Sequence, residues 1–548
     1  MKKTLHMFFV MITLFIPSIL PAEIAENWIN VFSYDNVAMG EVGMDIVVDS
    51  ERNSYVCGET GTVNYYDYDA FVEKISPNGE TLWTFVFGDD GQDNWADVFR
   101  KMVLDEENDA LYLVGEYCPP ENPAHPQICL VKMNLEGEMI YFNTYGEGAR
   151  GNDIILGNDG YIYISGATGD NFLLAKINPS SGNPVWISTS ESTGMSGGGM
   201  GICQGDDGSI YQGGTLDDKW AVLRYNSFGN LLWYSQYESA HSDGDWFPVA
   251  RFLEFYDGKI YAAGTVCDVT NNDIHLKCYN TNGVELWSQT FDGGYGFDMC
   301  EGMVKDSDGN FILGGHAAIS ETSSKSVVLK YSSEGELLWI YSDNVGGLEE
   351  GVLDIDIDSA NDVYITGYRQ IPGNEYPDDY LTQKLSSEDG AQIWEFTLDR
   401  DNTTDEAWAI DVFGIDDVFV TGRSHTWDTW YDVVTVNYYD EEQNFIADNQ
   451  LQTDDIQLNN YPNPFGESTK ISFHLKKEIS SYSSSQGKLC IYNIKGEKIR
   501  EFSILPYQSS IIWDGKDDKQ NIVSNGIYFC KLEINGKIIS HHKMILMH

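Results

Sequence analysis

A large aromatic residue returns at a nearly constant interval along most of this chain, each time at the end of a run that has the features of a β-hairpin. In one such unit, residues 326–339, Val327, Leu329 and Tyr331 alternate with Val328 and Lys330 at period two. A turn follows at Glu334-Gly335, and the unit ends on Trp339. The closing aromatic recurs about every 52 residues, at Trp28, Trp83, Tyr141, Trp186, Trp233, Trp287, Trp339 and Trp394. A period near 50 with four strands in each unit is typical of a β-propeller blade.

A second run, an apolar strand that closes on glycine, also occurs eight times, at Gly58, Gly115, Gly166, Gly214, Gly264, Gly314, Gly367 and Gly422. The last hairpin, which starts at Val433, has no closing tryptophan, whereas the chain opens with an unattached strand around Trp28. We therefore predict that the N-terminal strand completes the last blade and closes an eight-bladed ring without an open sheet edge. A seven-bladed ring is the alternative if the irregular unit near residues 120–200 is not a full blade.

The repeat resembles a known family. Asp306-Ser-Asp-Gly-Asn310, followed by the strand from Val327 and by Trp339, resembles the SBBP family of bacterial β-propeller repeats. The resemblance covers roughly residues 28–447. Residues 195–215 depart from it most, because Gly197-Gly198-Gly199 stands where the family alternates polar and apolar residues.

The end of the chain has a different character. Residues 451–548 carry 12 Lys and Arg against 10 Asp and Glu, although the whole chain has a net charge of -52. We expect a linker over 448–460 and a small immunoglobulin-like β-sandwich over 461–548, which contains Trp513-Asp-Gly515 and Gly526-Ile-Tyr528. This region resembles the C-terminal sorting domain of substrates of the bacterial type IX secretion system. The resemblance implies export by that machinery, removal of the domain, and release of the protein or its attachment to the cell surface.

The beginning of the chain has the pattern of a signal peptide over residues 1–22, with Lys2 and Lys3 before an apolar run that ends near Ala22. No later run approaches the length of a membrane span. The propeller would then occupy residues 23–447 of an exported, secreted or surface-located protein.

The charge limits the partners. A net charge of -52 excludes nucleic acid and disfavours anionic membranes, because both require a basic surface. We expect a monomeric, non-catalytic binding protein whose ligand is a glycan or a protein. A secreted polysaccharide-active lyase or hydrolase and an architectural adhesion component are the alternatives.

Binding residues are expected on one face of the ring. In an antiparallel meander the second turn of each blade and the link between blades share one end, and here these connections are long, as in residues 116–127 and 423–431. Aromatic side chains in these loops suit stacking on sugar rings, although they could equally cap the blades. The candidate ligand-binding residues are Trp246, Tyr376, Tyr380, Trp427 and Trp430.

Export permits disulfides, and the chain has nine cysteines. Two pairs lie eleven residues apart around equivalent loops, and a third pair falls in the C-terminal region. The predicted disulfides join Cys118 to Cys129, Cys267 to Cys278 and Cys490 to Cys530.

Motifs for catalysis or metal binding are weak. Residues 306–310 and Asp354-Ile-Asp-Ile-Asp358 resemble calcium-binding loops in their spacing of acids. The first segment lacks the Glu of an EF-hand and is better interpreted as a turn, and the second is better interpreted as surface charge on a strand. We expect no cofactor and no dedicated metal site, with weak calcium binding to the acidic surface. We predict no catalytic residue; Glu349-Glu350 and Asp378-Asp379 are the acids that the enzyme alternative would use.

Overall fold

The structure is a computed structural model of the chain. It describes residues 25–33, 40–61, 68–88, 96–122, 124–191, 198–237, 248–267, 271–343, 348–371, 378–427, 431–439, 458–461, 463, 465–466, 468–473, 487–493, 498–504, 510–517, 519, 522–534 and 537–547. The predicted signal peptide and most of the predicted linker lie outside these residues. The chain divides into two compact units, one built from residues 25–439 and the other from residues 458–547.

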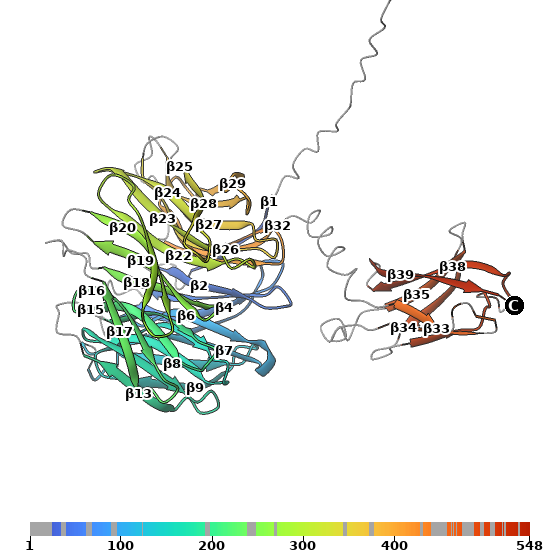
Figure 1. Cartoon of the computed structure of the whole chain (residues 1–548), viewed down its shortest axis with the longest axis horizontal. Coiled ribbons are helices and arrows are strands. Elements are labelled where there is room, and N and C mark those ends of the chain that lie inside the picture. The colour runs from blue at the N-terminus through green and yellow to red at the C-terminus, as the bar shows by residue number, and fades with distance from the viewer. Residues whose placement is uncertain are drawn as a thin grey trace, which may run out of the picture. The chain divides into compact units, whose positions relative to one another are not determined.

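The first unit consists of eight four-stranded antiparallel sheets, which we number as blades 1 to 8 (Figure 1). Blade 1 contains β2 (Val42–Val48), β3 (Ser54–Gly61), β4 (Tyr68–Ile75) and β5 (Thr81–Phe87), and blade 2 contains β6 (Val98–Asp105), β7 (Ala110–Tyr117), β8 (Gln127–Met133) and β9 (Met139–Tyr145). Blade 3 contains β10 (Ala149–Leu156), β11 (Ile162–Thr168), β12 (Asn171–Ile177) and β13 (Pro184–Ser190), and blade 4 contains β14 (Gly198–Gln204), β15 (Ile210–Leu216), β16 (Lys219–Tyr225) and β17 (Leu231–Tyr237). Blade 5 contains β18 (Val249–Tyr256), β19 (Lys259–Cys267), β20 (Asn272–Asn280) and β21 (Glu285–Phe291), and blade 6 contains β22 (Asp298–Lys305), β23 (Phe311–Ser320), β24 (Ser323–Tyr331) and β25 (Leu337–Asp343). Blade 7 contains β26 (Glu350–Ile357), β27 (Val363–Gln370), β28 (Asp378–Leu385) and β29 (Gln392–Leu398), and blade 8 contains β30 (Asp405–Phe413), β31 (Asp417–His425), β32 (Tyr431–Tyr439) and β1 (Ala25–Phe32).

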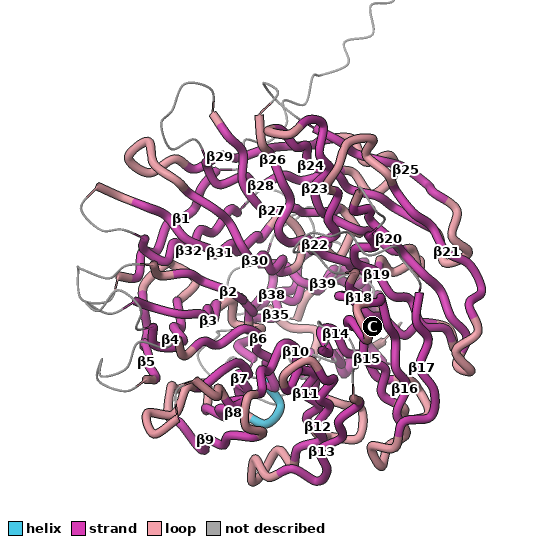
Figure 2. Tube along the Cα trace, turned by 90° about the vertical axis from the view of Figure 1, so that its left-hand side faces the viewer, coloured by secondary structure: helices cyan, strands magenta, loops and turns pink. Residues whose placement is uncertain are grey.

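The first strand of each blade lies at the centre of the ring and the fourth at its rim, as Figure 2 shows. Eight clusters of buried apolar side chains fill the eight junctions between neighbouring blades. The all-β fold and the eight blades are therefore confirmed, and the seven-bladed alternative is wrong because the irregular region forms the complete blades 2 and 3.

The ring closes through the N-terminal strand, as predicted. β1 pairs antiparallel with β32, with Trp28 opposite Asn437 and Phe32 opposite Val433. Because β1 is the fourth strand of blade 8, the last blade has the same four strands as the others, and the two ends of the propeller chain hold each other in one sheet.

The repeated aromatic residue joins each blade to the next one. At five junctions the indole Nε1 donates a hydrogen bond to a backbone carbonyl in the third turn of the following blade, as from Trp28 to Pro77 (3.0 Å) and from Trp339 to Ser387 (3.2 Å). A glycine of the same turn lies against the indole ring. A Cβ atom built on Gly79, which has φ +80°, would lie 2.7 Å from Trp28. Only glycine satisfies both the turn and the contact.

In blade 6 the lysine that precedes the hairpin turn also has a structural partner. Lys330 lies opposite Trp339 in the sheet, and its Nζ lies 2.8 Å from Asp306 and donates to the Ser387 carbonyl of the next blade. Asp306 also accepts hydrogen bonds from backbone N–H groups of its own turn. This aspartate therefore holds a turn and a lysine, in agreement with the interpretation of residues 306–310 as a turn.

In each blade, a glycine of the second strand faces a backbone carbonyl of the first strand. A Cβ atom on these glycines would lie 1.8–2.1 Å from that oxygen, which leaves no room for a side chain. The eight glycines are Gly58, Gly115, Gly166, Gly214, Gly264, Gly315, Gly367 and Gly422. In blade 6 the residue is Gly315 and not the predicted Gly314. The repeated glycine thus allows a close approach of two backbones.

The second unit contains a three-stranded sheet of β33 (Leu458–Tyr461), β34 (Thr469–Phe473) and β37 (Ser510–Trp513), and a four-stranded sheet of β35 (Gly487–Asn493), β36 (Lys498–Ile504), β38 (Gly526–Ile534) and β39 (Lys537–Leu546). Trp513 is fully buried, and its ring packs edge-on against Phe465 and Tyr528. The two sequence motifs therefore supply the centre of a small β-sandwich. Its first strand begins at Leu458, inside the predicted linker.

The three predicted disulfides are wrong: among the described residues, which include all nine cysteines, the structure has no disulfide. Cys278 lies opposite Tyr261 on β19, six residues before Cys267, which places it about 20 Å away along the strand. Cys129 lies opposite Gly115, three residues before Cys118. Both separations exceed the Cα distance that a disulfide spans.

The C-terminal pair fails for a different reason. Cys490 lies opposite Lys531, whereas Cys530 lies opposite Ile491. Residues that lie directly opposite each other share one face of a sheet, and successive residues alternate between faces. The thiols of Cys490 and Cys530 therefore project from opposite faces of the sheet.

Replacement of one of the eight glycines of the second strands tests the close approach of the two backbones. We expect Gly166→Ala to lower the free energy of unfolding by about 3 kcal/mol or more, because its Cβ atom would lie 2.0 Å from the Arg150 carbonyl oxygen. Gly160→Ala is the control, since Gly160 has φ +75° but open space around it and the cost there is about 1 kcal/mol of backbone strain. Urea unfolding followed by tryptophan fluorescence measures both; equal losses would contradict this account.

Candidate functional site

Each first strand has a β-bulge at the same height in the ring. Between the first and second strands of every blade the register shifts once, two residues after the carbonyl that the glycine approaches, as between Gly43 and Asp45 and between Ala407 and Ala409. A bulge re-aims a side chain, and here it leaves one extra residue on the strand that lines the centre. The bulged residues are Met44, Arg100, Asn152, Met200-Gly201, Arg251, Glu301, Leu353 and Trp408.

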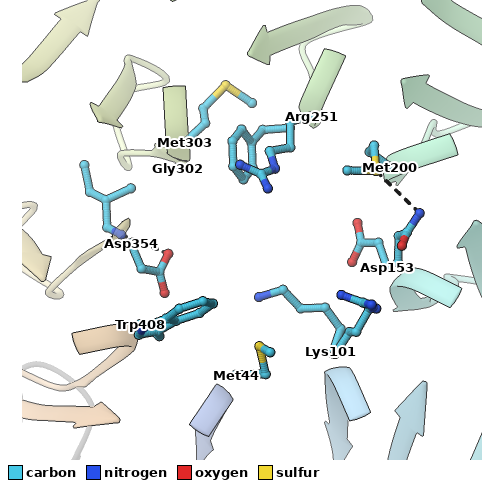
Figure 3. Close-up of a pocket in the computed structure, with 14 residues that line it drawn as sticks. Met44, Lys101, Asp153, Met200, Arg251, Gly302, Met303, Asp354 and Trp408 are labelled. Carbon is cyan, nitrogen blue, oxygen red and sulfur yellow. Dashed lines mark hydrogen bonds between the residues drawn. The ribbon is translucent and has the colours of Figure 1, made fainter. Parts of the chain in front are cut away.

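These strands enclose a central cavity of about 490 Å³. All eight blades contribute to its wall, and six of the eight bulges do so directly. A second space of about 410 Å³ shares Asp153, Arg251, Phe252 and Met303 with it, so the two are consecutive parts of one central channel. Figure 3 shows Lys101, Asp153, Asp354 and Trp408 pointing inward from different blades.

Aspartates connect the inner strands of neighbouring blades. The first strand is the inner edge of its sheet, so the N–H groups on its open side have no partner strand. Asp354 and Asp356 of blade 7 accept hydrogen bonds from the N–H groups of Ile410 and Val412 in blade 8, at 3.0 and 2.8 Å. Asp411 of blade 8 accepts one from blade 1 in the same way. The interpretation of Asp354 and Asp356 as solvated surface charge is therefore wrong.

Burial changes the acidity of these groups. Removal from bulk water raises the pKa of Asp153, Asp354 and Asp411 to about 6 in each case. The pKa of Asp356 rises to about 8, first because of burial and then because Asp411 carries a like charge nearby. The channel wall thus holds a set of carboxyl groups that bind protons near neutral pH.

Lys101 is one of three cationic residues of this wall, with Arg100 and Arg251. Its Nζ lies 2.8 Å from Asp45, and its side chain is 44% exposed within the channel. Enclosure alone would lower the pKa of the ammonium group, but the carboxylates of Asp45 and Asp354 outweigh that effect and raise it. Lys101 therefore keeps its proton and presents a fixed positive charge beside Asp153 and Asp354.

Trp408 is one of two aromatic residues that line the cavity, the other being Phe252. Its indole Nε1 donates to Glu406 (3.1 Å), and the guanidinium group of Arg423 lies 5.4 Å from its ring centre. Arg423 in turn forms an ion pair with Glu406 at 2.7 Å. The ring is thus held in place on the wall, next to acceptors and donors from other blades, which is the composition of a site for a polar molecule with an apolar face.

The predicted loop aromatics have different outcomes. Trp246, Tyr376 and Trp430 lie outside the described residues. Tyr380 is fully buried in β28 and its hydroxyl donates to the Val434 carbonyl of blade 8, so its expected place in an exposed loop is wrong. Trp427 is 66% exposed, and its role in binding stays a prediction.

The acids that the enzyme alternative would use have different surroundings in the structure. Glu350 is buried and forms an ion pair with Arg369 at 2.7 Å, so it stabilises blade 7. Asp379 is buried beside other carboxylates at the start of β28. Sequence reasoning missed Lys101, Asp153, Arg251 and Trp408. Their common signal is a position 13 or 14 residues before the repeated glycine, at or just after the bulge of the first strand.

The raised pKa values predict a dependence of stability on pH. A group whose pKa is higher in the folded chain stabilises the fold at low pH, and this contribution is lost as pH rises through the folded pKa. We expect the urea midpoint to fall from about pH 4, the pKa of an unfolded aspartate, to about pH 8, and Asp356→Asn to flatten the part of the fall between pH 6 and 8. Glu388→Gln, in an exposed turn, is the control and should leave the slope unchanged. An unchanged slope in Asp356→Asn would contradict the assignment.

Among the described residues, no helix has the length and apolar character required to cross a membrane. A search of curated protein sequences finds no match to the chain.

Solved structures with a similar arrangement are distant in sequence. The surface component PorZ of the type IX secretion system of Porphyromonas gingivalis is 10% identical, with 92% of this chain and 81% of that chain covered and a TM-score of 0.29. A protein from Lactobacillus plantarum is 14% identical over 65% of this chain and 98% of its own, with a TM-score of 0.41. Streptogramin B lyase is 12% identical over 75% and 97%, with a TM-score of 0.38. Likenesses at this level carry no information about function.

The C-terminal region gives a definite match. Residues 459–547 match the secretion system C-terminal sorting domain, which covers the whole of the small β-sandwich. The chain is thus a β-propeller that carries a sorting domain of the type IX secretion system, and it is exported to the cell surface or beyond.

Proposed function

We propose that the exported propeller is a non-catalytic binding protein that takes a glycan end into its central channel from the face with the long loops. The observation that supports this is the cavity itself. Its wall combines one fixed indole ring with carboxylate, amide and guanidinium groups from four blades, namely Trp408, Asp153, Asp354, Asn152 and Arg251.

The chemistry of this wall suits a sugar. A pyranose ring presents C–H groups on one face, which pack on an aromatic ring, and hydroxyls around its edge, which need both donors and acceptors. The cavity of about 490 Å³ accommodates one or two sugar units. A protein ligand would insert a polar side chain in the same place, and it is the second partner class compatible with the site.

Two tryptophan variants distinguish the channel from the loop face. We expect Trp408→Ala to weaken glycan binding at least about tenfold with little change in Tm, because the ring forms part of the cavity wall. Trp427→Ala removes an exposed ring outside the cavity and should leave affinity unchanged. A glycan array followed by calorimetry on the positive glycan provides the measurement. Loss of affinity in Trp427→Ala alone would favour the loop face and overturn the channel.

A polysaccharide-active enzyme is the second candidate, and one observation favours it. Asp153 and Asp354 have a pKa near 6 within a cavity, the range in which a carboxylic acid donates a proton at neutral pH. Product analysis of each glycan that binds decides between the two. Turnover that is lost in Asp354→Asn would establish the enzyme and exclude a purely binding role.

The fate of the sorting domain is a separate expectation. We propose that the domain is removed during export, so that the protein outside the cell ends before residue 461. Intact mass spectrometry of the extracellular form and of the cell-associated precursor tests this. Retention of residues 461–548 outside the cell would show that the domain stays attached as a stalk.

A further inference from the structure

Three carboxylates meet on the loop face, at the junction of blades 7 and 8. Asp379 is the second residue of β28, Asp399 follows the end of β29, and Asp405 is the first residue of β30. One oxygen from each residue lies within 4.8 Å of the other two. The antiparallel order of the strands therefore brings acids from three separate segments to one point.

Two of these carboxylates are buried with an oxygen that has no partner. Asp379 is 5% exposed and Asp405 is 0% exposed, and Oδ1 of each accepts no hydrogen bond from any described residue. The remaining oxygen of Asp405 accepts the N–H of Arg400 at 2.8 Å. A buried carboxylate oxygen without a partner costs free energy, and an acid beside two others costs more.

No described side chain neutralises the group. Asp379, Asp399 and Asp405 form no ion pair with any described residue, although the chain offers two guanidinium groups nearby. Arg400 donates to Asp432 and Ser424, and Arg369 pairs with Glu350, Glu395 and Asp343. The charge of the three acids is thus not compensated by any side chain that the structure describes.

We propose that Asp379, Asp399 and Asp405 form a calcium site. Calcium binds carboxylate oxygens at about 2.4 Å, so two ligands of one ion lie at most about 4.8 Å apart, which agrees with the spacing of these oxygens. Asp399 is exposed, so water can supply the remaining ligands of a coordination shell of six to eight oxygens. Magnesium fits less well, because it requires a nearly ideal octahedron and keeps most of its water.

The ion would join the two blades at the closing seam. Asp379 and Asp399 belong to blade 7 and its link, whereas Asp405 starts the blade that β1 completes. The same link carries Asp401, whose carbonyl accepts the indole N–H of the exposed Trp427 at 3.3 Å. Calcium at this point stabilises the closed ring and orders the link on the loop face. The site does not depend on the nature of the glycan or protein ligand.

A second acidic group provides an internal comparison. Asp273, Asp292 and Asp298 occupy the same positions at the junction of blades 5 and 6. There, however, Asp298 accepts the backbone N–H groups of Gly293 and Ala318, one on each oxygen. Its oxygens are already used, so we expect no ion at that junction.

Titration of the full extracellular protein with calcium after chelation tests the proposal. We expect calorimetry with CaCl₂ to show one site, and 10 mM calcium to raise the Tm by at least about 2 °C, as for the weak sites of extracellular modules. Asp379→Asn and Asp399→Asn should abolish both signals, while Asp292→Asn, the matched exposed variant at the other junction, should keep them.

The outcomes that overturn the proposal are clear. They are the absence of heat and of a Tm shift in the wild type at 10 mM calcium, retention of the shift in Asp399→Asn, or its loss in Asp292→Asn. An equal shift with MgCl₂ would overturn the assignment to calcium. Asp399 is exposed, so calcium binding to Asp399→Asn can still be measured if substitution of the buried Asp379 impairs folding.

Discussion

The contact between an outer-strand indole and a glycine turn of the next blade is the interaction on which the propeller depends. It satisfies the buried indole N–H, fills the junction between two sheets and fixes their angle, at Trp28, Trp83, Trp186, Trp233 and Trp339. It also explains the seam. The turn that would receive Trp394 does not exist, because blade 8 takes its fourth strand from the N terminus, and Asp416 approaches the indole N–H there instead, at 3.5 Å.

A second constraint acts at the centre of the ring. Eight glycines allow the second strand to approach the first, and beside each one the first strand bulges; six of the eight bulges line the central cavity. The backbone of this device is the same in every blade, whereas its side chains differ from methionine to arginine and tryptophan. The ring thus separates a repeated scaffold from a variable lining, so that the cavity can acquire specificity without loss of the fold.

The acidic composition has several structural uses. Aspartates hold the turns and lysines of the blades, as Asp306 does, and others bridge the inner edges of neighbouring sheets, as Asp354 does. A protein that is exported into a calcium-containing medium can also use acids as ligands. In the cluster of Asp379, Asp399 and Asp405 no described side chain pairs with the three acids, and the cluster lies at the junction of blades 7 and 8, beside the closing seam.

The sequence by itself determined the fold, because a repeated unit with local hairpins shows its period, its closing tryptophan and its unattached first strand without any knowledge of distant contacts. It also identified the sorting domain through Trp513-Asp-Gly515 and Gly526-Ile-Tyr528. The tertiary structure decided the rest. Strand register separated Cys267 from Cys278, burial moved Tyr380 into a blade junction, and bulges brought Lys101, Asp153 and Trp408 into one cavity. The first outcome depends on the register of two neighbouring strands, and the other two depend on which residues face each other across blades some 50 residues apart or more; no local pattern records either pairing.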